Sequence, residues 1–192
     1  MKIGFDLDKI FINTPPFLPM YVITKFYKAR DNGILLYRFP AKPEQLLRKA
    51  SHHPLLRPPI KQNLALLRDL AKDKNNHMYL ISSRFKFLEP ETEILVKKYG
   101  LDKIFDKLYF NYENKQPHKF KNEILQELKL DVFVDDDLSL IKYVAKENPK
   151  TQFFWLDERA KFAKLSDNIT SIANLKDMFE TKNYKSQIPI SK

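Results

Sequence analysis

The 192-residue sequence predicts an α/β fold in which helices cover both faces of a parallel sheet. Three observations support this prediction. Short apolar segments alternate along the chain with segments whose apolar residues recur at helical spacing. Hydrophobic residues make up 43% of the chain, which is enough to form the core of one domain. Three of the apolar segments end in acidic or hydroxyl-bearing residues, and the chemistry of parallel sheets sits at such strand ends.

The first expected strand begins almost at the N-terminus, spans residues 2–8 and ends in two carboxylates. Ile3 and Phe5 favour a strand, whereas Asp6 and Asp8 at its end do not. Alternate residues of a strand share a face, so we expect both carboxylates to point the same way. Two neighbouring carboxylates are costly unless a cation lies between them or one of them is protonated. The end of this strand is therefore a candidate functional site.

The segment from residue 15 to residue 57 predicts a small, mostly helical insertion. Pro15 and Pro16 end the first strand unit, because proline extends neither a sheet ladder nor a helix interior. Apolar and aromatic residues at 17–27 show weak helical spacing, and a helix is expected through residues 44–49. An Asp-Asn-Gly turn signal and a short apolar segment at residues 34–39 lie between these two pieces.

From residue 58 onward, strands and helices alternate. The expected strands are residues 77–81, 107–110, 131–134 and 152–156, and the expected helices are residues 60–74, 89–99, 118–128, 138–146 and 172–179. Gly100 follows one of these helices directly and is a typical stop signal. We therefore expect residues 1–14 and 58–180 to form the core domain, followed by a flexible basic tail at residues 181–192.

Composition excludes several classes of protein. The chain has no cysteine, which excludes disulfides, thiolate metal sites and a cysteine nucleophile. The N-terminus does not resemble a signal peptide and no apolar run has membrane-spanning length, so we expect a cytoplasmic protein with no membrane contact. The net charge of +10 fits an anionic partner, but the lysines are scattered and form no basic run with interleaved aromatics. We therefore interpret the lysines as solubilising surface charge, and nucleic acid is not favoured as a partner.

Three expected strands end in polar side chains, and parallel pairing would bring these ends to one edge of the sheet. They are Asp6 with Asp8, Ser82 with Ser83, and the acidic triplet at residues 135–137. Mg²⁺ prefers oxygen ligands and keeps several waters, so one or two carboxylates are enough to hold it. An aspartate can attack phosphorus, a second carboxylate can transfer protons, and a hydroxyl and a lysine can hold phosphoryl oxygens. The sequence therefore predicts phosphoryl transfer with Mg²⁺ as cofactor.

Four segments of the chain resemble, in order, the motifs of the haloacid dehalogenase superfamily of phosphohydrolases. They are Phe5-Asp6-Leu7-Asp8, Tyr79-Leu80-Ile81-Ser82-Ser83-Arg84, Lys119-Phe120-Lys121-Asn122-Glu123-Ile124-Leu125 and Val132-Phe133-Val134-Asp135-Asp136. Each is weak alone, but their order and spacing are specific. The resemblance covers residues 1–157 and implies a Rossmann-like sheet with a small helical cap at residues 15–57. The short cap, the Ser-Ser-Arg form and the paired aspartates resemble the nucleotidase-like branch.

The resemblance implies roles for the acidic residues. Asp6 would be the nucleophile, forming an aspartyl-phosphate, and also a ligand of Mg²⁺. Asp8 would be the general acid and base, with its backbone carbonyl on the metal. Asp135 and Asp136 would orient the metal, one of them directly. Asp137 is expected to cap the next helix, because aspartate is a preferred residue at that position.

The resemblance also implies a phosphate site. Ser82 and Ser83 would bind phosphate oxygens. Lys121 matches the spacing of the phosphate-stabilising lysine, and Lys119 is the alternative. One residue departs from the family pattern, because the family often has a small residue where this chain has Lys9.

Two alternatives to a phosphatase for small phosphomonoesters remain open. One is a non-catalytic, regulatory protein that binds a phosphorylated ligand. The other is a phosphatase for nucleic-acid ends, which predicts lysines clustered on one face and activity that falls steeply with salt. The aromatic residues of the insertion either stack on a base or form its core, and the core is favoured for most of them: Phe17, Tyr21, Phe26, Tyr27, Tyr37 and Phe39.

Overall fold

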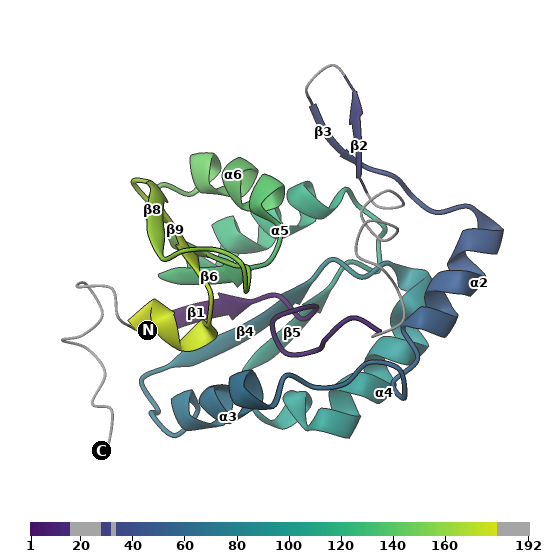
Figure 1. Cartoon of the computed structure of the whole chain (residues 1–192), viewed down its shortest axis with the longest axis horizontal. Helices are drawn as coiled ribbons and strands as arrows, with labels where there is room; N and C mark the ends of the chain where they lie inside the picture. Colours follow the sequence, from purple (N-terminus) through teal and green to yellow (C-terminus); the bar gives the residue numbers. More distant parts are fainter. Residues whose placement is uncertain (16–27, 32–33, 180–192) are drawn as a thin grey trace.

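The computed structural model describes residues 1–15, 28–31 and 34–179, and a seven-stranded sheet lies at its centre (Figure 1). Its strands are β1 (Lys2–Phe5), β4 (His77–Ser82), β5 (Lys107–Phe110), β6 (Val132–Asp135), β7 (Gln152–Leu156), β8 (Ala163–Ser166) and β9 (Ile169–Ile172). The strand order is β5-β4-β1-β6-β7-β9-β8. All neighbours pair in parallel except β8 and β9. The predicted α/β fold with a mostly parallel sheet is confirmed.

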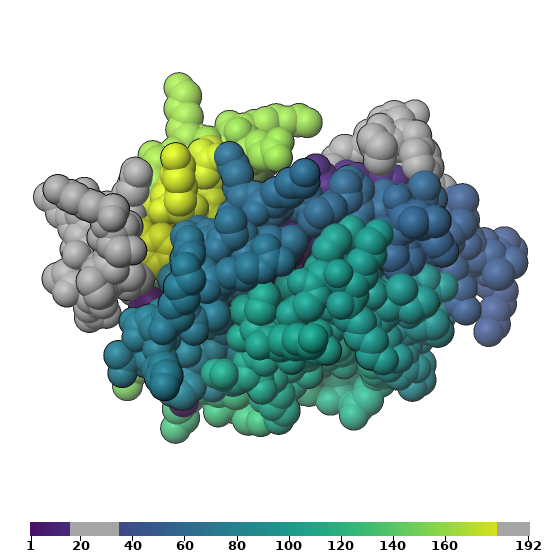
Figure 2. Space-filling view, turned by 90° about the horizontal axis from the view of Figure 1, so that it is seen from below, coloured from purple at the N-terminus to yellow at the C-terminus, as the bar shows by residue number. Residues whose placement is uncertain are grey.

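Helices cover both faces of this sheet, as Figure 1 shows. On one face lie α3 (Lys61–Leu70) and α4 (Glu89–Tyr99), and on the other lie α5 (Pro117–Leu128) and α6 (Leu138–Glu147). Each pair buries its apolar side chains against alternate residues of the strands, which gives one hydrophobic cluster on each side of the sheet. Short 3-10 helices complete the core: η1 (Lys86–Leu88), η2 (Leu101–Lys103) and η3 (Leu175–Phe179). Figure 2 shows the face formed by α3 and α4, with η3 beside α3.

Strand β1 has the position that matters most for function. It lies between β4 and β6, and Phe5 is opposite both Leu80 and Val134. The chain builds β4 and β5 on one side of β1 and then crosses to build β6 and β7 on the other. Parallel sheets of this kind bind ligands beyond the carboxyl ends of the strands at such a switch point. The residues that follow β1 and β6 therefore emerge at the place where a site is expected.

The predicted insertion is not mostly helical in the part that the structure describes. It contains an antiparallel hairpin of β2 (Lys28–Asp31) and β3 (Ile34–Tyr37), followed by helix α2 (Lys42–Ser51). An Asn-Gly pair between two short strands is a strong hairpin signal, and the sequence analysis used it only as a turn. Residues 17–27 and the tail at 181–192 lie outside the described residues. The division into core, cap and tail stays a prediction.

The last part of the core also differs from expectation. Residues 172–179 were expected to be helical, but β9 ends at Ile172 and only the 3-10 helix η3 follows. The hairpin of β8 and β9 was missed. All four residues of β8 are exposed, so this edge strand has none of the apolar alternation by which strands are recognised. Strand β1 ends at Phe5, three residues before its expected end, and α3 ends at Leu70, whereas the sequence placed the end of that helix just before Asn75. The remaining expected strands and helices of the core are found within two residues of their predicted bounds.

No helix in the described ranges is both long enough and apolar enough to cross a membrane.

Gly4 allows the central strand to pack closely against its neighbours, and Gly4→Ala tests this. A methyl group at Gly4 would overlap Leu130 and lie 2.9 Å from a ring carbon of Phe133. Because both neighbours are fully enclosed by the core, we expect Gly4→Ala to lower the free energy of unfolding by about 1–3 kcal/mol. Urea denaturation measures this difference. An unchanged midpoint would show that the core around β1 is looser than the structure indicates.

Candidate active site

Three carboxylates meet at the carboxyl ends of the two central strands. Asp6 follows β1, Asp135 is the last residue of β6, and Asp136 comes next. One carboxylate oxygen from each lies within 4.8 Å of the others. Asp6 and Asp135 are almost fully buried. They meet because β1 and β6 pair in parallel, and the backbone amide of Asp6 continues this pairing with a hydrogen bond to the carbonyl of Val134.

Lys121 supplies a buried positive charge to this trio of Asp6, Asp135 and Asp136. It lies on the sheet-facing side of α5, and its Nζ is 2.7 Å from Oδ1 of Asp6 and 2.7 Å from Oδ2 of Asp135. Burial alone would lower the pKa of Lys121, but these two carboxylates raise it above its usual value. Lys119, two residues earlier, is exposed. Of the two candidate lysines, the structure brings only Lys121 into contact with Asp6.

The trio has more negative charge than one lysine balances. Burial raises the pKa of Asp6 to about 7, an effect that Lys121 offsets only in part and that Asp135 increases. Burial likewise raises the pKa of Asp136 to about 6, although Lys9 opposes the shift. An added cation would favour the ionised form of both carboxylates. The electrostatics of the trio therefore suit a cation-binding site.

Lys9, the residue that departs from the family pattern, folds over Asp136. Its backbone is left-handed, with a φ of 58°, which places its side chain back across the strand ends. Its Nζ is 2.5 Å from Oδ2 of Asp136, and the side chain is about one-third exposed. The indole N–H of Trp155 donates to the backbone carbonyl of Asp136 and so fixes the backbone that carries the carboxylate bound by Lys9. Lys9 thus forms one wall of the site.

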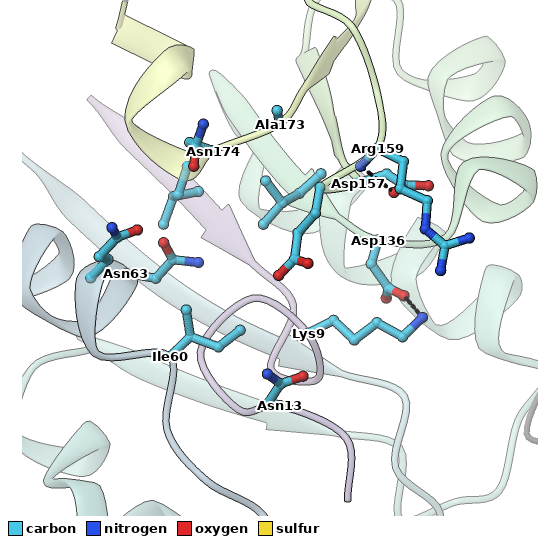
Figure 3. A pocket seen from close by; sticks show the side chains of 13 residues that line it. Lys9, Asn13, Ile60, Asn63, Asp136, Asp157, Arg159, Ala173 and Asn174 are labelled. Carbon is cyan, nitrogen blue, oxygen red and sulfur yellow. Dashed lines mark hydrogen bonds and ion pairs between the residues drawn. The ribbon is translucent and has the colours of Figure 1, made fainter. Parts of the chain in front are cut away.

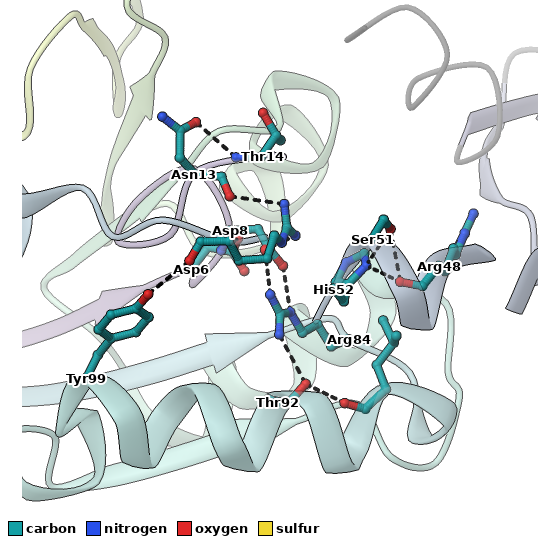
Figure 4. A network of polar contacts seen from close by, with 12 residues as sticks. Asp6, Asp8, Asn13, Thr14, Arg48, Ser51, His52, Arg84, Thr92 and Tyr99 are labelled. Atoms are coloured by element: carbon teal, nitrogen blue, oxygen red, sulfur yellow. Dashed lines mark hydrogen bonds and ion pairs between the residues drawn. The ribbon is translucent and has the colours of Figure 1, made fainter. Parts of the chain in front are cut away.

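Asp8 has different hydrogen-bond partners from Asp6, namely Arg57 and Arg84 (Figure 4). Strand β1 ends at Phe5, so its alternation does not extend to Asp8. Arg84 binds both oxygens of Asp8 at 2.8 Å, and Arg57 binds one at 2.5 Å. Burial alone would raise the pKa of Asp8, but the two guanidinium groups outweigh it and hold the pKa well below its usual range. The carboxylate of Asp8 is therefore locked in an ion-pair network outside the trio.

Ser82 and Ser83 lie on the neighbouring strand end. Phe5 is opposite Leu80, so Ser82 extends β4 alongside the residues that follow β1. Ser82 is buried, and the Oγ of Ser83 is enclosed with no hydrogen-bond partner within the described part of the chain. A buried hydroxyl without a partner costs free energy, so a ligand oxygen at this place would be stabilising.

Comparison with known proteins gives a consistent result for the fold. No family model and no curated protein matches the sequence. Among solved structures, a haloacid dehalogenase-like hydrolase from Streptococcus pneumoniae is 16% identical, with a TM-score of 0.53 over 81% of this chain and 84% of that one. A HAD-superfamily hydrolase from Ehrlichia chaffeensis is 15% identical, with a TM-score of 0.53 over 93% of both chains. The chain has the haloacid dehalogenase-like fold.

A third neighbour with this fold carries ligands. It is a HAD-family enzyme from Bacteroides thetaiotaomicron in complex with magnesium and inorganic phosphate, 14% identical, with a TM-score of 0.53 over 84% of this chain and 96% of that one. At such identities these similarities establish the fold of the present chain and nothing finer.

The candidate site also contains contacts to Asp8 that the sequence analysis did not predict. Arg84 was noted within a motif but given no role, and Arg57 was not singled out. Nothing in the sequence marks Arg57 as a partner of Asp8, because the two are 49 residues apart and meet only through the fold. Arg84 directly follows Ser82 and Ser83 at the end of a strand, and this position could have indicated that it belongs to the site.

Asp137 and Tyr37 connect the insertion to the acidic loop. Asp137 accepts hydrogen bonds from the backbone amides of Ser139 and Leu140, so its predicted role as helix cap is confirmed. The hydroxyl of Tyr37 donates to Asp137 at 2.7 Å, and the backbone of Tyr37 exchanges two hydrogen bonds with the side chain of Gln116. Tyr37 is buried, but in the hydrophobic cluster between the sheet and α5 and α6 and not in a core of the insertion, which corrects the expectation for this residue. It is therefore not available to stack on a base.

Replacing each candidate lysine by methionine separates their roles in stability. In Lys121→Met, Asp6 and Asp135 face each other without a cation, and we expect the free energy of unfolding to fall by about 2–3 kcal/mol. The loss is limited because a carboxylate with a raised pKa can take up a proton. Lys119→Met should change stability by less than about 0.5 kcal/mol, because its side chain is exposed. Equal losses in urea denaturation would contradict the arrangement described.

Proposed function

We propose that the chain is a Mg²⁺-dependent phosphomonoester hydrolase that uses Asp6 as an aspartate nucleophile. The observation that carries this proposal is the contact of one buried lysine with two carboxylates at the carboxyl ends of the central strands, Lys121 with Asp6 and Asp135. A purely structural role for this cluster is unfavourable, since two of its three carboxylates, Asp6 and Asp135, are buried and have lost their hydration. A bound cation and a phosphoryl group account for the cluster.

The residues present fit Mg²⁺. The trio offers only oxygen donors, with one oxygen of each carboxylate within 4.8 Å of the others, and a further cation beside them would oppose the effect of burial that raises the pKa values of Asp6 and Asp136. Asp6, Asp135 and Asp136 would hold the ion, and the backbone carbonyl of Asp8 is the further ligand implied by the resemblance. When bound, Mg²⁺ would neutralise charge on the phosphoryl oxygens.

The side chains of the site can carry out the proposed reaction. A carboxylate oxygen of Asp6 forms a bond to phosphorus while the bond from phosphorus to the ester oxygen breaks, and the leaving alcohol takes up a proton. Water then attacks the aspartyl-phosphate, loses a proton, and releases inorganic phosphate with free Asp6. In this proposal Lys121, whose ammonium contacts Asp6 and Asp135, would bind phosphoryl oxygens together with the hydroxyls of Ser82 and Ser83.

Asp8 is the proposed proton carrier in both steps, since its carboxylate is the next in the chain after Asp6. Its two guanidinium partners oppose this role, because they keep the carboxylate ionised. Proton transfer by Asp8 therefore requires its contact with Arg57 or Arg84 to open when substrate is bound.

The test is a phosphate-release assay with and without Mg²⁺. The panel contains a generic aryl phosphate, nucleoside monophosphates as the nucleotidase-like substrates implied by the sequence, sugar and polyol phosphates, and a 3′-phosphorylated oligonucleotide. We expect release that depends on Mg²⁺ and stops with chelator. Folded protein that is silent across the panel, while binding inorganic phosphate by calorimetry, would instead support a non-catalytic binding protein.

A further inference from the structure

A second feature of the strand ends is a pocket beside Lys9 and Asp136 (Figure 3). Its volume is about 270 Å³. Its walls come from the residues that follow β6, β7 and β9, from the loop after β1, and from the start of α3. Asp136 belongs both to this pocket and to the acidic trio. The pocket therefore opens next to the place where the proposed phosphoryl group would lie, on the side away from Ser82.

The chemistry of the pocket wall is unusual for a site that is meant to hold a nucleobase. None of its 13 lining residues is aromatic, so nothing in it offers a stacking surface. Four carboxamides line it: Asn13, Gln62, Asn63 and Asn174. Each carboxamide can both donate and accept hydrogen bonds, as a hydroxyl group does. The wall thus suits a ligand with several hydroxyls.

The charges of the pocket also disfavour a second anionic group. Three carboxylates line it, from Asp136, Asp157 and Glu158, against two cations, Lys9 and Arg159. Lys9 is already paired with Asp136. A second phosphate or a polynucleotide backbone would therefore meet net negative charge, whereas carboxylates readily accept hydrogen bonds from neutral hydroxyls.

Some of the polar groups in this pocket are available to a ligand. Among the described residues, the side chains of Gln62, Glu158 and Asn174 have no hydrogen bond or ion pair to the protein, whereas the amide of Asn63 donates to the carbonyl of Ile10 and is structural. Figure 3 shows Asn174 across the pocket from the Lys9–Asp136 pair. A ligand that spans the pocket would thus reach from the acidic trio to Asn174.

We infer that this pocket binds the alcohol part of the substrate, and that this part is an uncharged polyhydroxy group, as in a sugar or polyol phosphate. The link between this pocket and catalysis rests on the proposed function. The binding of a free polyol in the pocket does not depend on it. The size of the pocket agrees, because it lies just below the usual range for ligand sites of about 300–1,000 Å³ and fits one small ring or chain.

Methyl NMR of the intact chain tests the pocket without using catalysis. Ile60, Leu156 and Leu175 line the pocket and provide methyl probes. We expect their signals to shift on titration with free pentitols, hexitols or aldohexoses, and not with nucleosides. Shifts with nucleosides alone, or with neither class, would overturn the inference even if the chain proves to be a phosphatase.

Kinetics supply the second test. In Gln62→Leu and Asn174→Leu, we expect kcat/KM for the best sugar or polyol phosphate to fall about 5- to 10-fold each, the size expected for one lost hydrogen bond to a neutral group. Gln126→Leu makes the same change at an exposed position of α5, away from the pocket, and should leave kcat/KM unchanged. Unchanged kcat/KM in both pocket variants would overturn the inference.

These outcomes separate the two proposals. Hydrolysis of nucleotides or aryl phosphates but not of sugar or polyol phosphates would support the proposed function and overturn the assignment of the pocket. Methyl shifts on titration with polyols, in a chain that releases no phosphate, would support the assignment of the pocket and overturn the proposed function.

Discussion

Asp6→Asn is expected to abolish phosphate release, lowering kcat by at least about 10³-fold, because an amide oxygen cannot form the proposed bond to phosphorus. The substitution keeps the shape of the side chain. The backbone amide of Asp8 now donates to Oδ2 of Asp6, and an asparagine oxygen can accept the same hydrogen bond. Lys121 keeps its second partner, Asp135, so the variant is expected to fold. The measurement is release of phosphate from an aryl phosphate at saturating Mg²⁺.

A matched control isolates the effect of Asp6. Asp102→Asn makes the same chemical change at an exposed position in η2 and should keep full activity. Activity of Asp6→Asn above about a tenth of the original would rule out an aspartate nucleophile at this position. If Asp6→Asn loses activity because it unfolds, as detected by circular dichroism, the expectation that the variant folds would be wrong.

Asp8→Ala is expected to have the largest effect on stability, lowering the free energy of unfolding by about 3–5 kcal/mol. The substitution leaves Arg57 and Arg84 without their shared carboxylate, and both guanidinium groups are almost completely buried. Arginine does not lose its proton in proteins, so these charges have no way to neutralise. This separates Asp8→Ala from Lys121→Met, in which the remaining carboxylates can take up a proton. Urea denaturation at neutral pH measures both variants.

Two further measurements keep this prediction specific. Glu147→Ala removes an exposed carboxylate from the end of α6 and should change stability by less than about 0.5 kcal/mol. Because the folded-state pKa of Asp8 is depressed, its stabilisation is fully present above the ordinary carboxyl range and is lost as pH falls below it. The part of the difference between the original chain and Asp8→Ala that comes from these ion pairs should therefore persist down to about pH 5 and shrink only in more acidic solution. The Asp8 carboxylate also helps to raise the pKa of Asp6, which adds a pH dependence near neutrality. A difference that vanished near pH 6 would contradict the ion-pair network.

The sequence was sufficient to predict the layout of the core, because its strands are short apolar segments between helices with clear apolar spacing. It also indicated which strand ends meet, since Asp6, Ser82 and Asp135 end strands that pair in parallel. It failed where local signals were weak or long-range contacts decided the outcome. Strand β8 is exposed along its whole length, and the hairpin of β2 and β3 was hidden within a segment assigned to helices.

The surroundings of Asp8 show why site chemistry is harder to predict than fold. Its position two residues after Asp6 suggested a shared face and a shared task. Its actual partners, Arg57 and Arg84, are supplied by segments 49 and 76 residues away, and no pattern in the sequence links them. The pKa of a carboxyl group depends on such neighbours more than on its place in a motif.

The ion pairs at the strand ends have a consequence for the order in which ligands bind. They join four acidic to four basic side chains: Asp6, Asp8, Asp135 and Asp136 with Lys9, Lys121, Arg57 and Arg84. In its fully ionised form this network is electrically neutral. A divalent cation alone would leave two uncompensated positive charges in poorly hydrated surroundings, and a phosphate dianion alone would leave two negative ones. Bound together they cancel, so each is expected to raise the affinity of the network for the other by the same factor.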